Sequence, residues 1–279
     1  MDGGKKEMTE TLLFKAALAA YLAAAVVYGG SLLKRRVLTA RFGAGLMLIA
    51  LGIHTFYYLF RWIAEANIPS IDVYDTLSFF SWVMAASYLA MQLRTKTRVL
   101  GAFVAPVISV LMIIASIDLG GSVVGSSALK GTLVIIHVML SVAGEALFAV
   151  ASLAGVMYLL QDRLLRKKRD RSLIHLFPSL HDLDRINYIC LFWGFSLLTL
   201  GILAGSFWAR IVWGSHWQWD PKQVWTLLAW AFYAFLLHQR LAIGWQGRKA
   251  ARWSLMAFIV LLLMFVLENL LFRSAHTFM

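Results

Sequence analysis

The residues best suited to chemistry lie in one short stretch, residues 213–225, between two long apolar segments. It reads Trp-Gly-Ser-His-Trp-Gln-Trp-Asp-Pro-Lys-Gln-Val-Trp, so it holds four of the 11 Trp residues, with an acid, a base and a His between them. Aromatic rings between apolar segments are ordinary anchors at a membrane interface. Four so close together favour a platform for a large flat ligand. We call this stretch the Trp loop, and its candidate binding residues are Trp213, Trp217, Trp219, Asp220 and Trp225.

His54 is the candidate ligand inside the membrane. It lies about twelve residues into an apolar segment, near mid-membrane at about 1.5 Å per residue. An intramembrane His is by default a hypothesis of a functional site. The alternative is a His that is hydrogen-bonded to a hydroxyl or carbonyl of a neighbouring helix.

Two further histidines are candidate ligands at a membrane surface. His137 stands near one end of a long apolar segment, and His276 follows the last apolar segment. Both are expected beside the Trp loop. Two neutral imidazoles on opposite faces of a planar macrocycle give bis-His haem ligation. Zinc, with His216 and Asp220 as further ligands, is the alternative that the spacing also permits.

Basic residues at the same surface fit either of two roles. Arg side chains form strong charge-assisted pairs with carboxylates, which include the propionates of haem. The other interpretation makes them ordinary residues that flank membrane spans. The residues in question are Arg61, Arg210, Lys222 and Arg273.

Composition places these residues in a membrane protein. Of 279 residues, 61% are hydrophobic and 14% are charged, and the mean hydropathy is +0.74. A soluble domain would carry nearer a quarter charged residues. Long apolar runs without strand-type alternation predict an all-α, polytopic helical bundle with about eight transmembrane helices. The expected spans are 11–33, 42–60, 76–93, 99–117, 131–160, 187–209, 224–240 and 253–271.

The distribution of charge predicts the orientation. Most of the 26 Lys and Arg residues follow the first, third, fifth and seventh spans, as expected of cytoplasmic connections. Both termini and the Trp loop are therefore expected outside. The net charge of +12 thus indicates a lipid bilayer and no nucleic acid. The single cysteine, Cys190, excludes an internal disulfide, thiol-disulfide exchange through a Cys-x-x-Cys pair, and covalent c-type haem.

The Trp loop resembles the tryptophan-rich "WWD" domain of the haem-handling cytochrome c assembly family. The flanking histidines fit that family as well. The segment from His54 through Arg61-Trp62, Asn67-x-Pro69 and Val73-Tyr74-Asp75-Thr76-Leu77 is similar to the family's membrane histidine and the stretch after it. Eight spans with outside termini resemble most closely the CcsA (ResC) branch. Two departures are Gln223, where the family has an acid, and the ending Ala275-His276-Thr277-Phe278.

The resemblance implies a function in cytochrome c biogenesis. Residues 1–41 would form the first span and a basic loop, and residues 42–279 the WWD membrane domain. Such a protein lies in the bacterial cytoplasmic (inner) membrane with its Trp loop on the periplasmic side. It binds haem b transiently and presents it to apocytochrome c. A CcsB (ResB)-like membrane partner completes a haem lyase (holocytochrome c synthase) complex and supplies a second membrane histidine.

The resemblance also implies ligand roles. His137 and His276 would be axial ligands at the outer site, and His54 would bind haem iron within the membrane. Two alternatives remain open. One is a HemX-like membrane regulator of tetrapyrrole synthesis, which needs no apocytochrome. The other is a proton- or cation-coupled transporter that uses His54 and Glu145 as a relay.

Overall fold

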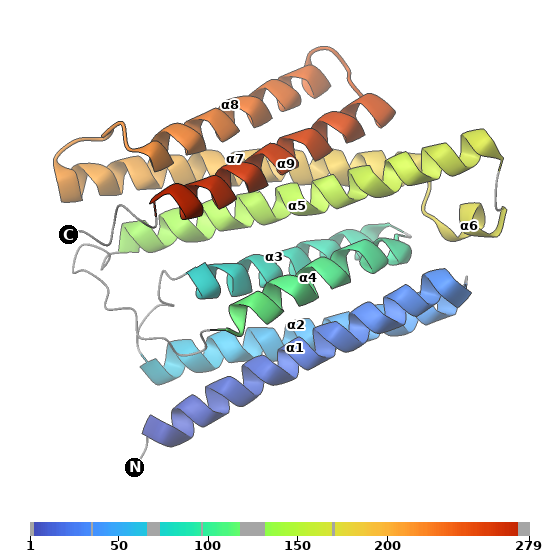
Figure 1. The fold of residues 1–279 in the computed structure, drawn as a ribbon, viewed down its shortest axis with the longest axis horizontal. Helices are drawn as coiled ribbons and strands as arrows, with labels where there is room; N and C mark the ends of the chain where they lie inside the picture. Colours follow the sequence, from blue (N-terminus) through green and yellow to red (C-terminus); the bar gives the residue numbers. More distant parts are fainter. Residues whose placement is uncertain are drawn as a thin grey trace. The chain divides into compact units, whose positions relative to one another are not determined.

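The prediction of an all-α membrane bundle is confirmed. The computed structural model describes residues 3–34, 36–65, 73–95, 97–117, 132–168 and 171–272, and long helices dominate these residues (Figure 1). The helices are α1 (Gly3–Lys34), α2 (Val37–Glu65), α3 (Val73–Arg94), the 3₁₀ turn η1 (Arg98–Leu100), α4 (Gly101–Ala115), α5 (Thr132–Lys167), α6 (Arg171–Leu176), α7 (Leu180–Trp213), α8 (Pro221–Leu241) and α9 (Gly247–Phe272).

Among the described residues, seven helices are long and apolar enough to cross a membrane, so the chain is a polytopic membrane protein. They are α1, α2, α3, η1 with α4, α5, α7 and α9. The span expected at 224–240 corresponds to α8, which is not among these seven. Its 21 residues suffice in length, but Lys222, His238 and Arg240 lower its hydropathy.

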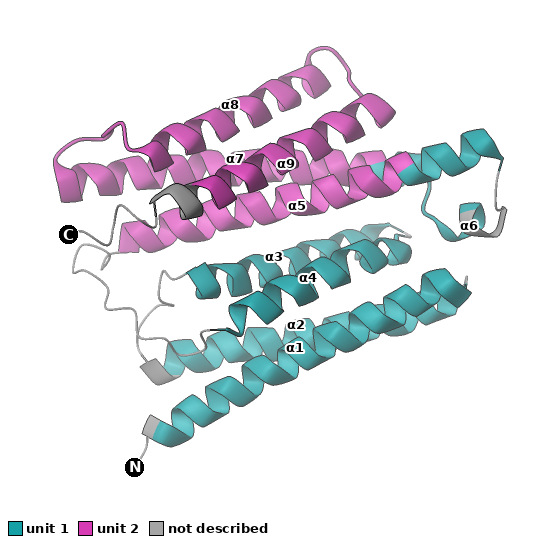
Figure 2. Ribbon diagram, viewed as in Figure 1, with its two compact units in different colours: residues 1–130, 160–183 teal, residues 131–159, 184–279 magenta. Residues whose placement is uncertain are grey.

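The chain forms two compact units (Figure 2). Unit 1 comprises residues 1–130 and 160–183, and unit 2 comprises residues 131–159 and 184–279. Helix α5 contributes to both units. His54 therefore belongs to unit 1, whereas His137 and the Trp loop belong to unit 2.

In unit 1, Tyr28 of α1 holds helices together at close range. Its ring lies against Gly43 of α2 and Gly101 of α4, where any Cβ would collide with it. Its hydroxyl is hydrogen-bonded to the Tyr88 hydroxyl of α3 at 2.9 Å. Small residues at helix contacts are the usual way in which membrane helices approach closely, because lipid gives apolar side chains no driving force to associate.

In unit 2, a polar cluster ties α8 to α7 at the end away from the Trp loop. The Arg240 side chain, 3% exposed, forms an ion pair with Asp184 at 3.0 Å and donates to the Asn187 amide oxygen at 2.7 Å. Asn187 in turn donates to the Ala151 carbonyl of α5 and to the Ser254 hydroxyl of α9. The cluster therefore links all four long helices of the unit.

Within unit 2, α8 runs from the Trp loop to the α8–α9 turn, and α9 returns beside it (Figure 1). At about 1.5 Å per residue, its 21 residues extend about 31 Å, the thickness of a hydrocarbon core. The α9 helix can return to the Trp-loop end only because α8 has crossed the unit. This course supports eight spans rather than seven.

Candidate functional site

The Trp loop begins at the C-terminal end of α7, where Gly214 ends the helix. Helix α7 ends at Trp213, and Gly214 follows with φ +76° and donates its N–H to the Arg210 carbonyl at 2.9 Å. Glycine adopts this left-handed conformation without the penalty that a Cβ brings. The Trp213 ring packs edge-on against Trp208, with ring centroids 5.1 Å apart.

Trp217 and Trp219 form a perpendicular pair in the middle of the loop. Their ring centroids are 5.5 Å apart and their planes make an angle of 89°. Trp219 has φ +55°, which is uncommon for a residue with a large side chain, and it is 79% exposed. Most of the Trp219 ring therefore stays exposed on the surface of the loop.

The loop closes onto the start of α8 through two polar side chains. Asp220 is the N-cap residue, and its carboxylate accepts the Lys222 N–H at 2.7 Å. Pro221 occupies the first helical position, where its fixed φ favours the helix. The amide oxygen of Gln223 accepts the Gln218 N–H at 2.8 Å. Asp220 therefore has a structural role in the loop, and Trp225 follows within the first turns of α8.

One ring nitrogen of His137, Nδ1, is hydrogen-bonded to the backbone of α7. Its Nδ1 lies 2.7 Å from the Gly201 carbonyl oxygen of α7, so Nδ1 carries the proton and donates. Within the described part of the chain, Nε2 has no hydrogen bond. A ligand His typically donates its second N–H to a carbonyl or carboxylate, which fixes its tautomer and orientation. The geometry of His137 therefore fits an iron ligand through Nε2.

His216 lies in the Trp loop, just beyond the end of α7. Arg210 donates to His216 Nε2 at 3.0 Å, and Nδ1 lies 3.2 Å from the Ser206 carbonyl. His216 would therefore have to give up Arg210 before its Nε2 could bind a metal. Within the described residues, no three His, Cys, Asp or Glu side chains are grouped to hold a metal ion.

His54 is fully buried and uses both ring nitrogens. Nδ1 lies 3.4 Å from the Tyr21 hydroxyl of α1, and Nε2 lies 3.0 Å from the Ser78 hydroxyl of α3. The Tyr58 ring stacks on the imidazole at 5.0 Å, and its hydroxyl donates to Ser78. This is the arrangement of a His bonded to hydroxyls of neighbouring helices.

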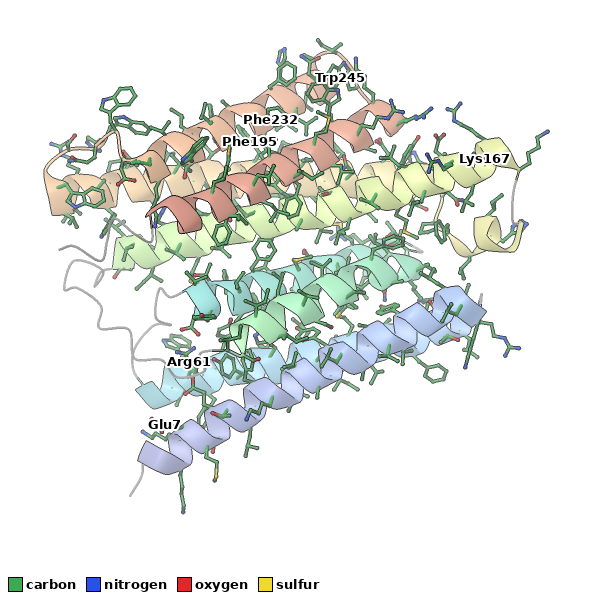
Figure 3. The ribbon with its side chains drawn as sticks, viewed as in Figure 1. Glu7, Arg61, Lys167, Phe195, Phe232 and Trp245 are labelled. Carbon is green, nitrogen blue, oxygen red and sulfur yellow. The ribbon has the colours of Figure 1, made fainter. Side chains whose placement is uncertain are left out.

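Arg61, which is labelled in Figure 3, is engaged by carboxylates of its own unit. Its guanidinium forms ion pairs with Glu10 of α1 at 2.8 Å and Asp75 of α3 at 2.7 Å, and it also donates to the Tyr57 hydroxyl. These pairs connect the ends of three helices. As placed, Arg61 therefore holds helices together rather than offering its charge to a ligand.

The chain matches the family described as Cytochrome C assembly protein over residues 70–276. This match covers most of the chain. The chain belongs to the cytochrome c assembly family.

Relatives named cytochrome c biogenesis protein CcsA agree with this membership. The chain is 30% identical to CcsA of Trieres chinensis over 249 residues, which cover 78% of this chain and 80% of the relative. It is 29% identical to CcsA of Microcystis aeruginosa over 78% of this chain and 81% of the relative. With CcsA of Porphyra purpurea it shares 28% identity across 98% of both chains. The resemblance inferred from the Trp loop is confirmed.

Gln223 departs from the pattern expected of the cytochrome c assembly family but keeps a hydrogen-bond acceptor. The carboxylate expected at this position is replaced by an amide, whose oxygen still accepts the Gln218 N–H that closes the loop.

His276 and Arg273 lie outside the described residues. Sequence reasoning missed the residues that contact the two histidines, namely Tyr21, Ser78, Gly201 and Gly205, because they are distant in sequence and chemically ordinary.

Proposed function

We propose that this protein binds haem b as cargo at the outer membrane surface and presents it for attachment to apocytochrome c. The observation that carries the proposal is His137, whose Nδ1–H is held by the Gly201 carbonyl while Nε2 has no hydrogen bond within the described residues. His276 is the proposed ligand on the opposite face of the macrocycle. Bis-His ligation keeps the iron coordinated, and haem supplies the vinyl groups to which cysteine thiols attach.

The Trp loop is the proposed binding surface for the haem macrocycle. Trp213, Trp217, Trp219 and Trp225 provide aromatic surface, and burial of flat apolar area stabilises such a complex by about 25 cal/mol per Å². Asp220 and Gln223 keep the loop closed on α8. Arg210, an exposed cation that donates to His216 of the loop, is a proposed partner of a propionate, whereas Arg61 is paired within unit 1.

His54 is the proposed ligand inside the membrane, and it binds transiently. Its Nε2 must exchange the Ser78 hydroxyl for iron before it binds haem. Breaking this hydrogen bond costs about 0.5–1.5 kcal/mol, a small opposing term beside an iron–imidazole bond. Competition with Ser78 thus lowers the affinity of His54 for iron by about fivefold.

The proposed setting is the bacterial cytoplasmic membrane, with the Trp loop on the periplasmic side. A CcsB (ResB)-like membrane protein is the proposed partner, and the two form a holocytochrome c synthase complex. The CcsA names of the relatives and their coverage of this chain support this assignment. The role of the chain is to hold and orient haem, since the bond-forming chemistry belongs to haem and the apocytochrome.

The test is the absorption spectrum of the protein purified with its CcsB-like partner. We expect a low-spin haem spectrum that is lost in His137→Ala and in His276→Ala. His181→Ala is the control, because it removes an exposed His at the start of α7, at the opposite end of that helix from the Trp loop. A preparation without haem, or a spectrum unchanged in both ligand variants, contradicts the proposal.

A genetic test separates haem delivery from regulation. Deletion of the gene should abolish covalently bound haem in c-type cytochromes, detected by haem staining of membranes. If c-type cytochromes persist while tetrapyrrole levels change, the chain acts as a HemX-like regulator instead.

A further inference from the structure

Two glycines of α7 lie directly against the ring of His137. A Cβ at Gly205 would stand 2.6 Å from His137 Nδ1 and 2.8 Å from its Cε1, closer than real Cβ contacts allow. Gly201, one turn earlier, supplies the carbonyl that accepts the Nδ1–H, and a Cβ there would collide with Ser141. The imidazole thus occupies space that any other residue at position 205 would fill.

We propose that Gly201 and Gly205 form a seat on α7 that fixes the tautomer and ring plane of His137 and so presents Nε2 to iron. This proposal rests on the function proposed above. Gly201 and Gly205 are positioning residues, since they act through His137 and not on haem itself. The Gly201–Gly205 seat fixes the ligand in two ways.

The first way is the hydrogen bond from Nδ1 to the Gly201 carbonyl. It holds the proton on Nδ1, so Nε2 is the unprotonated nitrogen, which is the form that binds metal. Loss of such a partner costs about 10- to 100-fold in metal affinity in other metal sites.

The second way is the absence of a side chain at Gly205. A methyl group there would displace the ring from its position over α7, and the displaced ring would lose the Gly201 carbonyl. The same glycines bring α5 and α7 close together, so a packing role must be separated from a positioning role.

The chain offers a matched control for packing. Gly194 lies at the same α5–α7 contact, and a Cβ there would stand 2.7 Å from the Phe148 ring. Gly194→Ala therefore forces a methyl group against the Phe148 ring and the Gly144 carbonyl of α5 without touching a histidine, so it strains the packing at least as much as Gly205→Ala does. Only Gly205→Ala should change the iron site.

The experiment compares wild type, Gly205→Ala, Gly194→Ala and His137→Ala, each purified with the CcsB-like partner. Haem retained per protein, the absorption spectrum and the low-spin electron paramagnetic resonance of the ferric form are measured. We expect Gly205→Ala to retain about 10-fold less haem or to show altered low-spin g values. Gly194→Ala should match wild type in haem content and g values.

The outcomes separate this proposal from the function on which it rests. If His137→Ala keeps the wild-type spectrum, the proposed function fails and the seat with it. If His137→Ala loses the spectrum while Gly205→Ala keeps it, the Gly201–Gly205 seat is overturned and the proposed function stands. Equal losses in Gly205→Ala and Gly194→Ala attribute the effect to packing and also overturn the seat.

A measurement on the wild-type chain tests the seat even if Gly205→Ala does not fold. Nitrogen NMR of ¹⁵N-histidine-labelled, haem-free protein in nanodiscs reports the tautomer, and His137→Gln assigns the resonance. We expect a single tautomer that is protonated on Nδ1. Protonation on Nε2, or rapid exchange between tautomers, overturns the proposal.

Discussion

His137 and His54 differ in how many of their ring nitrogens are hydrogen-bonded. His137 uses Nδ1 on a backbone carbonyl, and its Nε2 has no hydrogen bond within the described residues. His54 uses both nitrogens on hydroxyls of α1 and α3. As proposed ligands, His137 could bind iron without losing a hydrogen bond, whereas His54 would first have to give up Ser78.

Removal of the Ser78 hydroxyl should make His54 a better ligand. In Ser78→Ala, Nε2 loses its partner in a buried site, so iron no longer competes with a hydrogen bond of about 1 kcal/mol. We expect haem bound at His54 to rise about fivefold, measured as the haem that His54→Ala removes from the purified protein.

Ser81→Ala is the control for the Ser78 prediction. Ser81 is also buried on α3, but its hydroxyl bonds the Leu77 carbonyl of its own helix and does not reach His54. Its haem content should equal that of wild type. Unchanged or lower haem in Ser78→Ala would mean that Ser78 does not restrain His54.

At the scale of single residues, the sequence predicts the candidate ligands but not their hydrogen-bond partners. His54 and His137 stand out because an imidazole is costly inside an apolar segment. Their partners are hydroxyls and a carbonyl from segments 24 to 64 residues away. Ser, Tyr and Gly are common in membrane helices, and no local pattern shows which of them faces a given His.

At the scale of elements, the loop between α7 and α8 is ordered by its own hydrogen bonds. Gly214 ends α7, Asp220 begins α8, and Gln223 ties the loop back to Gln218. The Asp-Pro pair predicts the start of α8 from the sequence, since both residues favour a helix N-terminus. The role of Gln223 was not predicted, because a single departure from a family pattern does not reveal a retained hydrogen bond.

The closure by Gln223 predicts a difference between two substitutions. Gln223→Glu keeps an oxygen that accepts the Gln218 N–H, whereas Gln223→Ala leaves that N–H without its partner. A lost hydrogen bond of about 1 kcal/mol should lower mature c-type cytochrome about fivefold in Gln223→Ala, measured by haem staining. Gln223→Glu should remain near wild type, and equal defects in both variants would contradict a role for the acceptor.

The polar cluster at the other end of unit 2 predicts a stability effect. Arg240→Ala leaves Asp184 and Asn187 without their buried partner, and removing one member of a buried pair costs about 3–5 kcal/mol. We expect a clear fall in the thermal unfolding temperature of the purified protein. Arg166→Ala is the control, because its pair with Asp162 is 65% exposed on the Arg side and worth at most about 1 kcal/mol. Equal shifts would contradict the cluster's role.

At the scale of the whole molecule, the sequence predicts the number of helices better than their lengths. Apolar runs mark the membrane core, but the helices continue beyond it through polar residues. Helix α5 extends from Thr132 to Lys167, past the expected end at residue 160, because Arg and Lys are good helix formers that reach water. Helix α8 was expected as a span at 224–240, and it has the length of one, but the polar residues at its ends keep it out of the seven helices that are apolar enough to cross a membrane.

The orientation of the chain follows from its charge, and surface labelling tests it. The single natural cysteine, Cys190, is fully buried, so the parent protein gives little labelling with a membrane-impermeant maleimide. Gln218→Cys places a thiol in the exposed Trp loop, and Lys167→Cys places one at the C-terminal end of α5, where Figure 3 labels that residue.

If both termini and the Trp loop are outside, intact cells should label Gln218→Cys and leave Lys167→Cys unlabelled until the membrane is permeabilised. The physical reason is the positive-inside rule, because Lys167 lies in the most basic connection of the chain. If epitope tags at the N-terminus and at the C-terminus are both accessible in intact cells, an even number of spans lies between them, and α8 counts as the seventh of eight. Labelling of Lys167→Cys in intact cells, with Gln218→Cys protected, would reverse the orientation and place the haem site on the cytoplasmic face.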